Sequence, residues 1–389
     1  MREGWKEVTI GDLGKVVTGN TPPKNDPSNY GGDYPFIKPT DMEIGRRYCT
    51  NWEENYSEKA FKKYKNSYIP PKSTGVVTIG TVGDKLFQAD RWCFTNQSVN
   101  VIIPNTELYD EDFIYYLMKI NLPKVENANP GTASGRHHVS KSNFCAIKVR
   151  VPESKDNQKK IASILSGYDD LIENNLKRIK ILEEMAQQTY EEWFVRMRFP
   201  GHESAIIIPE TGLLEGWEKD LVSNQLGKVK STTKIKSSEF QNEGNIPVVD
   251  QSRSFIAGFT NDDSSLIEYS GIPYIVFGDH TRILKLINFD FARGADGTQI
   301  VLSKNPKMPQ HLFYFSLMNI DLSNYHYARH YKYLKDSEII IPTEGIAQRF
   351  EELAKKNFDA IQNLRTQNQR LREARDILLP RLMMGMIEV

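Results

Sequence analysis

The sequence predicts an α+β protein with an internal pseudo-twofold repeat: two similar α/β domains separated by two long antiparallel helices that form a coiled coil. Two stretches carry a heptad pattern, Gln158 to Met197 and Gln348 to Met384. One constant offset maps every seam position of the first stretch onto the second, from Ile161 and Phe350 to Trp193 and Leu382. Short motifs in the rest of the chain also recur in the same order. These observations indicate one unit that has been copied in tandem.

The seam of each stretch consists of positions a and d of the heptad, which are mostly apolar. Apolar residues at this period form a stripe that a partner helix can cover. We expect the following seam side chains to contact a partner: Ile161, Leu165, Ile172, Ile179, Leu182, Trp193, Ile361, Leu364, Leu371 and Leu378.

Three asparagines, Asn175, Asn357 and Asn368, fall on the same seam. A polar residue at such a position lowers stability and can fix the register of the two helices. The alternative is that they mark frayed or solvated turns. For the stretches as a whole, the alternative is two ordinary amphipathic helices, each packed on its own domain. Their length of about 40 residues favours the coiled coil, because helices of globular domains seldom exceed about 25 residues.

The motifs outside the helices recur in order. GWKEVTIGDLGKV at 4–16 is echoed by GWEKDLVSNQLGKV at 216–229, FIYYLM at 113–118 by FYFSLM at 313–318, and IKVRVP at 147–152 by EIIIP at 338–342. Runs such as VNVIIP at 99–104, bounded by turn residues, are typical of strands. We therefore expect a globular domain at 1–152, a long helix at 153–198, a second globular domain at 199–342 and a second helix at 343–389.

Composition restricts the class of protein. The 389 residues include 50 basic and 50 acidic side chains, a balance that argues mildly against non-specific binding to nucleic acid. No apolar run is long enough to cross a membrane, and MREGWKEVTI lacks the apolar core of a signal peptide. The three cysteines, Cys49, Cys93 and Cys145, lack CxxC spacing and are typical of reduced thiols. We expect a cytoplasmic protein.

Catalytic signatures are absent from the sequence. It contains no GxxxxGK[ST] loop, no NPP followed by an aromatic residue, no HExxH, no paired CxxC and no GxSxG. His137 and His138 lie in a Gly/Ser loop that lacks further ligands, so a contact surface is favoured over a metal site. Asp279 and His280 have no nucleophile motif to accompany them. We expect no catalytic residue, no metal and no cofactor in this chain.

Several polar loops carry residue types that contact phosphates and base edges. Arg and Lys suit phosphate and guanine, and Asn and Gln suit adenine. A single loop is weak evidence because solvated turns have the same composition. The loops recur at corresponding places in both repeats, which favours binding, and we take Gln97 and Gln299 as equivalent. The candidate contacts are Asn20, Thr21, Lys24, Lys38, Thr40, Asn96, Gln97, Ser134, Arg136, His137, His138, Gln251, Arg253, His280, Arg282, Arg293, Gln299, Tyr327, Arg329 and Tyr331.

With these features the chain resembles the specificity subunit of Type I restriction-modification enzymes. The resemblance covers essentially the whole chain. It is carried by the opening GW(K/E) with LGKV, the TGNTPPK and TNQSVN loops, the two register-matched helices and the closing LLPRLMMGMI. No single motif is diagnostic, whereas their order and duplication are.

The resemblance implies a DNA-reading, non-catalytic subunit. Its globular domains would be target recognition domains, each reading half of a split site in double-stranded DNA. Its helices would set the spacing and dock two modification subunits. S-adenosylmethionine and ATP chemistry would belong to those and to restriction subunits.

The zero net charge departs from this picture. Either partner subunits supply much of the phosphate binding, or basic residues gather on one face: Arg46, Arg47, Lys62, Lys63, Lys228, Lys230, Lys234 and Lys236. The alternatives are an adaptor that bridges proteins, with the helices as a spacer, and a stand-alone nuclease or methyltransferase. The missing motifs argue against the last of these.

Overall fold

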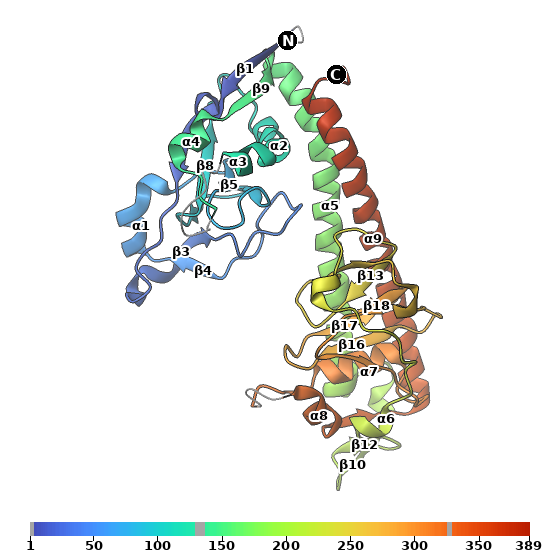
Figure 1. Cartoon of the computed structure of the whole chain (residues 1–389). Coiled ribbons are helices and arrows are strands. Elements are labelled where there is room, and N and C mark those ends of the chain that lie inside the picture. The colour runs from blue at the N-terminus through green and yellow to red at the C-terminus, as the bar shows by residue number, and fades with distance from the viewer. Residues whose placement is uncertain (1–3, 129–136, 325–328) are drawn as a thin grey trace. The chain divides into compact units, whose positions relative to one another are not determined.

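The computed structural model describes residues 4–128, 137–324 and 329–389, and the chain divides into two compact units (Figure 1). Unit 1 comprises Met1–Asn175 and Thr366–Val389, and unit 2 comprises Leu176–Arg365. The two long helices, α5 (Lys155–Tyr190) and α9 (Glu344–Met383), each contribute one part to each unit.

The described residues in the globular part of unit 1 form a four-stranded sheet, a three-stranded sheet, a two-stranded pair and four short α-helices. The larger sheet has the order β2 (Gly14–Thr18), β8 (Val99–Pro104), β5 (Thr74–Val77), β6 (Leu86–Gln88), with antiparallel neighbours. The smaller has the order β4 (Glu54–Tyr56), β3 (Tyr30–Ile37), β7 (Phe94–Thr95), and its β3–β7 pair is parallel. A further pair joins β1 (Trp5–Thr9) to β9 (Lys148–Pro152). The helices are α1 (Glu58–Tyr64), α2 (Glu111–Ile120), α3 (Leu122–Asn127) and α4 (Lys141–Ala146).

Unit 2 repeats this arrangement. One sheet has the order β17 (Leu284–Ile287), β16 (Tyr274–Gly278), β19 (Thr298–Val301). The other has the order β14 (Gly258–Thr260), β13 (Ile246–Val249), β18 (Phe291–Arg293), β15 (Leu266–Ile267), and β13–β18 is again parallel. β12 (Glu218–Leu221) pairs with β20 (Glu338–Ile341), as β1 pairs with β9. The remaining elements are the hairpin β10 (Ile207–Ile208) and β11 (Leu213–Leu214), and the helices α6 (Val222–Gln225), α7 (Gln310–Met318) and α8 (His330–Lys335). The predicted internal repeat is confirmed.

Both predicted stretches form long helices: α5 ends at Tyr190 and is followed by a π-helical segment, Glu191–Val195, and α9 ends at Met383. α5 has 36 residues and α9 has 40, lengths of about 54 and 60 Å at 1.5 Å per residue. The Ser154 hydroxyl accepts a hydrogen bond from the Asn157 N–H at 3.4 Å and so caps the start of α5. α9 ends just before Gly385, which adopts φ +66°, a conformation common after helix C-termini.

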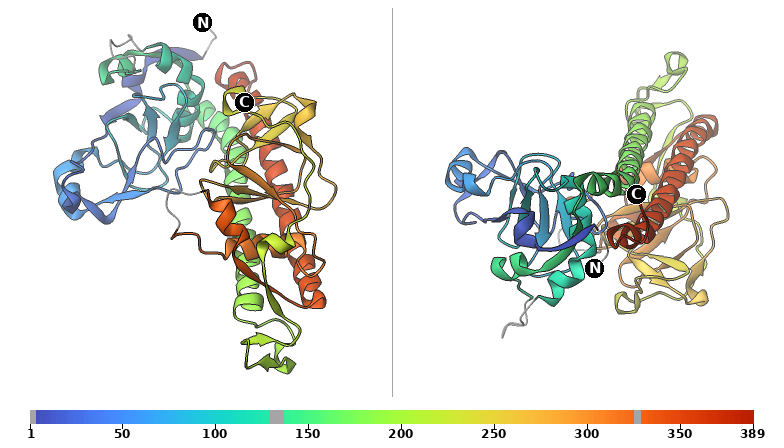
Figure 2. Two further views of the ribbon diagram at one scale, coloured as in Figure 1. Left: turned by 60° about the horizontal axis from the view of Figure 1, so that its bottom comes forward. Right: turned by 90° about the horizontal axis from the view of Figure 1, so that it is seen from above.

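In each unit the two helices pack antiparallel (Figures 1 and 2). In unit 1, the early residues Ile161 and Leu165 of α5 share a core with Leu379 and Leu382, near the end of α9. In unit 2, Ile179 shares a core with Leu364, and the late residues of α5 pack near the start of α9. The Trp193 and Phe350 rings lie 6.0 Å apart there. The predicted antiparallel pair is therefore confirmed.

The seam side chains are used inside the chain. Seven of the ten that we expected to contact a partner are buried, and Leu182, Leu371 and Leu378 are half-buried. The prediction that these side chains bind another subunit is wrong, because the second helix and the globular domains already cover the seam. The exposed apolar residues of the helices include Ile164, Leu171, Ile181, Met185, Leu353 and Ile377.

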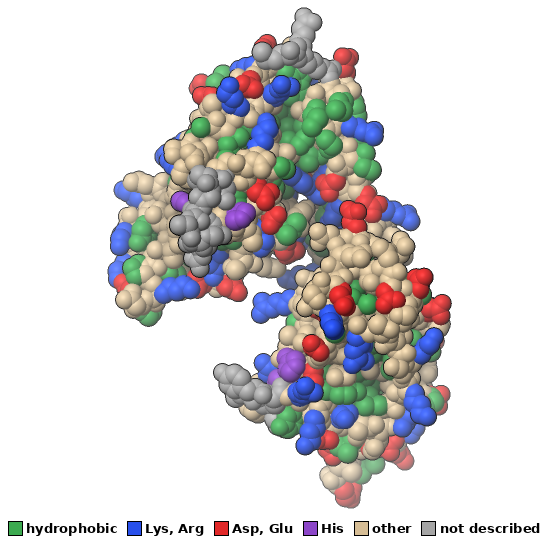
Figure 3. All heavy atoms as spheres, in the orientation of Figure 1, with side chains coloured by type: hydrophobic (Ala, Val, Ile, Leu, Met, Phe, Trp, Pro, Cys, Tyr) green, Lys and Arg blue, Asp and Glu red, His purple; other side chains and the backbone are tan. Residues whose placement is uncertain are grey.

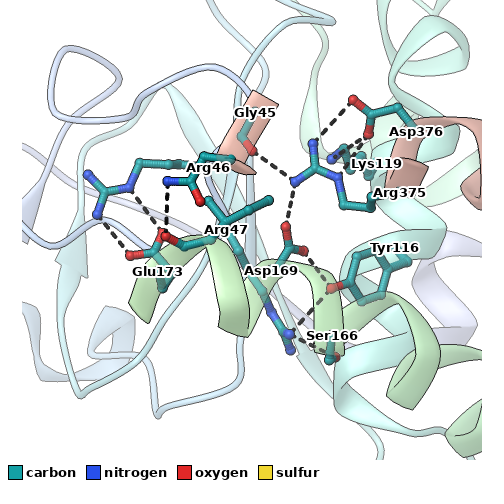
Figure 4. Close-up of polar contacts among 12 residues, drawn as sticks. Gly45, Arg46, Arg47, Tyr116, Lys119, Ser166, Asp169, Glu173, Arg375 and Asp376 are labelled. Atoms are coloured by element: carbon teal, nitrogen blue, oxygen red, sulfur yellow. Dashed lines mark hydrogen bonds and ion pairs between the residues drawn. The ribbon is translucent and has the colours of Figure 1, made fainter. Parts of the chain in front are cut away.

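A buried polar cluster attaches the globular part of unit 1 to the helices (Figure 4). Asp169 of α5 is 2% exposed, accepts a hydrogen bond from the Tyr116 hydroxyl and pairs with Arg375 of α9. Arg375 also donates to the Gly45 carbonyl at 3.2 Å. Because one guanidinium contacts α5, its own helix and the 45–47 loop, the cluster joins three segments of the unit.

Two neighbouring arginines belong to the same cluster. Arg46 pairs with Glu173 at 2.9 Å, and the buried Arg47 pairs with Asp112 and donates to the Ser166 hydroxyl at 2.8 Å. The prediction that these two arginines belong to a basic surface is wrong. Burial lowers the pKa of Arg46 and Arg47, but the surrounding carboxylates and tyrosines outweigh it and raise both pKa values.

Unit 2 attaches its globular part differently. Tyr190, Phe315, Phe350 and Phe358 form edge and stacked contacts with centroids 5.9–6.2 Å apart. By the constant offset between the two seams, the counterpart of Asp169 is Phe358, and the counterpart of Arg375 is Ala186. Aromatic packing therefore replaces the ion pair in the second repeat.

Among the described residues, no helix is long and apolar enough to cross a membrane. Cys49 and Cys93 are buried free thiols, and burial raises the pKa of the Cys49 thiol to about 12.

We expect Asp169→Ala to lower the free energy of unfolding by about 3 kcal/mol, because it removes the buried partner of Arg375 on α5 and leaves only the more exposed Asp376 of its own helix beside that charge. Lys355→Ala, which removes an exposed pair with Asp359, should cost under about 1 kcal/mol. Denaturant titration of the full chain measures both. Equal small losses would mean that the cluster does not stabilise unit 1.

Candidate nucleic-acid interface

Three loops of unit 2 meet at one end of its sheets, and we call them the unit-2 loop cluster: 250–254, 278–282 and 294–299. The Gln251 side-chain N–H donates to the Asp296 carbonyl at 3.0 Å, and the His280 N–H donates to the Gln251 side-chain oxygen at 3.1 Å. The Thr281 hydroxyl donates to the Gln251 carbonyl at 2.7 Å. One amide side chain thus connects the three loops.

The backbone of this cluster requires glycine at position 297. Asp296 and Gly297 adopt φ +53° and +72°, in the left-handed region that glycine favours. A Cβ at Gly297 would lie 2.7 Å from the His280 ring and 2.8 Å from the Gln251 amide. The close approach of these two side chains therefore depends on the missing side chain.

The predicted residues Arg293 and Gln299 are also adjacent. Arg293 donates to the Thr298 carbonyl at 2.7 Å and to the Gln299 side-chain oxygen at 3.2 Å. Burial lowers the pKa of the Arg293 guanidinium. Arg293 is therefore engaged in holding the 294–299 loop.

Helix α8 lies beside the same loops. The Tyr331 N–H donates to the Asp279 carboxylate at 2.8 Å, which places Asp279 at the start of this helix. Burial raises the pKa of the Tyr331 hydroxyl, so this group stays protonated. The Arg282 guanidinium donates to the Leu322 carbonyl at 3.1 Å. Arg253, His280, Arg282 and Arg329 are exposed.

A buried lysine supports the cluster from beneath. Lys285 donates to the Asp250 carbonyl at 2.7 Å and to the Ser254 carbonyl at 2.5 Å, so it fixes both ends of the 250–254 loop. Burial lowers the pKa of the Lys285 ammonium. The sequence analysis missed this residue, because a lysine within the apolar run of β17 gives no signal of a loop contact.

Unit 1 brings its predicted residues together at the corresponding end of its sheets, in what we call the unit-1 loop cluster: 18–21, 95–100, 78–80 and 137–139. The Asn20 N–H donates to the Thr95 carbonyl at 2.9 Å, and the Thr21 hydroxyl contacts the Gln97 side chain. A Cβ at Gly19 would lie 2.2 Å from the Thr95 carbonyl oxygen, so glycine is required there as well.

The loop that contains His137 and His138 joins this cluster through hydrogen bonds to segment 78–80. The Gly80 N–H donates to the His137 carbonyl at 3.0 Å, and the Val139 N–H donates to the Thr78 carbonyl at 2.8 Å. His137 and His138 are exposed. Ser134, Arg136 and Tyr327, which we predicted as contacts, lie outside the described residues.

The remaining predicted residues of unit 1 lie nearby in sequence. They differ in whether their side chains are free to contact a ligand. Lys24 and Thr40 are exposed. Lys38 pairs with Glu53 at 3.1 Å and Glu54 at 3.3 Å. Burial lowers the pKa of Lys38, but the two carboxylates outweigh it and raise that pKa, so the charge is present and already compensated.

The expected equivalence of Gln97 and Gln299 is wrong. Gln299 lies inside β19 opposite Phe277, whereas Gln97 lies in the turn before β8. The residue in the matching strand position is Asn100, opposite Val76 of β5. The turn between β18 and β19 is one residue longer than the turn between β7 and β8, which shifts the alignment.

Asn100 is a structural residue that the sequence analysis did not single out. It is buried, accepts a hydrogen bond from the Thr18 hydroxyl at 2.6 Å and donates to the Thr78 hydroxyl at 3.0 Å. A polar residue within the apolar run VNVIIP was the available signal.

Charge is mixed over the surface. On the face drawn in Figure 3, basic and acidic side chains are interspersed within each unit. The described part of the chain contains no group of three or more His, Cys, Asp or Glu that could hold a metal ion.

Comparison with known proteins finds similarity to one family. A family model described as "Type I restriction modification DNA specificity domain" matches residues 2–184. The chain is 29% identical over 412 aligned positions to the Type I restriction enzyme MjaIX specificity subunit of Methanocaldococcus jannaschii, covering 99% of this chain and 94% of that one. It is 31% identical over 185 positions to the HindI specificity subunit of Haemophilus influenzae, covering 46% of this chain and 39% of that one.

A solved structure supports the fold. The Type I restriction-modification S subunit from M. genitalium matches with a TM-score of 0.55 and 16% identity, over 97% of this chain and 96% of that one. These matches give no support to the bridging-adaptor alternative. The repeated fold and the sequence matches agree: over essentially its whole length this chain is similar to specificity subunits of Type I restriction-modification enzymes.

Proposed function

We propose that this chain reads a bipartite sequence in double-stranded DNA, one half-site with each loop cluster, and leaves methylation and cleavage to other subunits. The observation that carries the proposal is the repetition of the site. Two units of one fold gather amide, imidazole, hydroxyl and cationic side chains at the same end of equivalent sheets. Because the two sets of side chains differ, the two half-sites should differ.

The contacts within each cluster distinguish residues that hold the loops in place from residues that are free to contact DNA. Gln251 and Arg293 use their side chains to hold loops, so they would position neighbours rather than meet bases. The exposed His280, Arg282, Arg253 and Arg329 are the candidates for base and phosphate contacts in unit 2. Arginine suits guanine and phosphate.

In unit 1 the exposed candidates are Lys24, Thr40, Gln97, His137 and His138. Gln97 is the amide with the geometry for adenine, although its oxygen accepts from Thr21 in this structure. The net charge of zero leaves much of the phosphate neutralisation to partner subunits.

The exposed apolar side chains of the helices are the proposed docking surface for two modification subunits. Ile164, Leu171 and Met185 are 40–52% exposed and are separated by multiples of seven residues, so they lie on one face of α5 outside the seam. Leu353, the counterpart of Ile164 in the second repeat, is exposed on α9. S-adenosylmethionine would act in these modification subunits, and ATP in restriction subunits.

We expect footprinting of the chain assembled with its modification subunits to show two short protected tracts separated by unread base pairs. Sequencing of modified adenines would report the same two half-sites and their gap. Binding without sequence preference on any DNA would rule out the reading role.

We expect Gly297→Ala to abolish discrimination at one half-site while the other is still read, because the new Cβ would separate His280 from Gln251. Gly271→Ala is the matched control: Gly271 has φ +92° but no atom within 4 Å of its would-be Cβ. Modified-adenine sequencing measures both variants. Equal effects would assign the defect to backbone strain alone.

We expect removal of one heptad from each helix, residues 176–182 together with 361–367, to shorten the gap by about three base pairs. Seven residues span about 10 Å, and base pairs stack about 3.4 Å apart. Both helices must be shortened because their seams pair position by position. Unchanged half-sites with an unchanged gap would contradict the spacing role.

A further inference from the structure

Two polar contacts interrupt the apolar seam in unit 1, and we call them the register pairs: Asn175 with Asn368, and Asp169 with Arg375. The Asn175 side-chain N–H donates to the Asn368 side-chain oxygen at 2.9 Å, and the Asn368 N–H is directed to the Ile172 carbonyl at 3.4 Å. Asn175 is 6% exposed and Asn368 is 1% exposed. These amides are therefore satisfied by each other and by the backbone rather than by water.

The apolar part of the seam does not define one alignment. If α9 moved by one heptad along α5, Ile172 would meet Leu364 or Leu378, and either contact is apolar. A heptad pattern is by construction nearly unchanged by a shift of seven residues. Apolar contacts between the two helices alone therefore discriminate weakly between the native and the shifted alignments.

The register pairs are broken when the helices are shifted by one heptad. A shift in one direction would place Asn175 against Ile361, and in the other it would place Asn368 against Leu182 and Asp169 against Leu382. Each shift would leave a buried amide or carboxylate without a partner, which costs more free energy than the original hydrogen bond contributed. The alignment in the structure satisfies all four side chains.

The second repeat lacks these pairs. The counterparts of Asn175 and Asn368 in the other copy of the seam are Leu364 and Ile179, which belong to one apolar core. The counterparts of Asp169 and Arg375 are Phe358 and Ala186. An apolar pair at the same place in unit 2 shows that the fold does not need amides there for stability.

We propose that Asn175, Asn368, Asp169 and Arg375 are positioning residues that fix the register of α5 on α9, and thereby the number of base pairs between the half-sites. This inference rests on the proposed reading function. A shift of one heptad would change the helix alignment by about 10 Å, or about three base pairs. The Asn175 and Asn368 amides would thus select one gap between the half-sites, and they would lower the stability of the helix pair relative to apolar side chains.

The test compares full-length Asn175→Leu/Asn368→Leu with the control Ile179→Leu/Leu364→Ile, which changes the corresponding apolar pair. Each is built with Glu183→Cys and Arg365→Cys, whose native side chains meet at 3.0 Å, and with Cys145→Ser. A short bismaleimide then reports whether α5 and α9 keep their native alignment. Thermal unfolding gives Tm.

We expect the asparagine variant to have a Tm equal to or above that of the control and a cross-link yield lower by at least about twofold. Assembled with modification subunits, it should modify sites with an additional gap about three base pairs longer or shorter. A lower Tm, or full cross-linking with a single gap, would overturn the proposal.

The cross-link readout does not depend on DNA. If the unaltered chain modified no bipartite site, the proposed function would fail, and the cross-link would still decide whether the amides fix the helix alignment.

Discussion

The antiparallel contact between α5 and α9 is the constraint on which both units depend. Each unit uses one segment of each helix to complete its core, as Ile161 and Leu382 do in unit 1 and Ile179 and Leu364 do in unit 2. The largest core of each unit includes these helix segments. Any change in the helix contact is therefore felt in the packing of the globular parts, and hence in the support of the loop clusters.

Periodicity carried most of the fold prediction. The heptad seam, the constant offset between its two copies and the strand-like runs predicted the two long helices, their antiparallel contact and the repeat, because each signal is local and periodic. Strand β8 lies at the predicted residues. Helix α4 was missed because KSNFCA is too short and too polar to show a period.

The candidate site was predictable in composition but not in detail. The sequence indicated which loops carry residue types that suit DNA contacts, and the structure brings Gln251, His280 and Gly297 together. It could not show that Arg46 and Arg47 are buried, because a basic dipeptide in a polar loop looks the same in either setting. Whether a side chain is free to bind a ligand depends on partners that are distant in sequence. Glu173, the partner of Arg46, lies 127 positions away from it.

The different attachment of the two globular parts has a consequence for acid sensitivity. Burial raises the pKa of Asp112, but Arg47 and Lys72 outweigh it and hold that pKa below its usual value; the pKa of Asp376 is lowered in the same way by Arg375 and Lys119. A carboxylate with a depressed pKa contributes stability above its unfolded pKa and loses it as pH falls through the folded value. Acidification should therefore weaken the attachment of the globular part of unit 1 to the helices. In unit 2 a carboxylate also joins the globular part to α9, because Glu351, next to Phe350, accepts hydrogen bonds from the His311 ring and the His311 N–H.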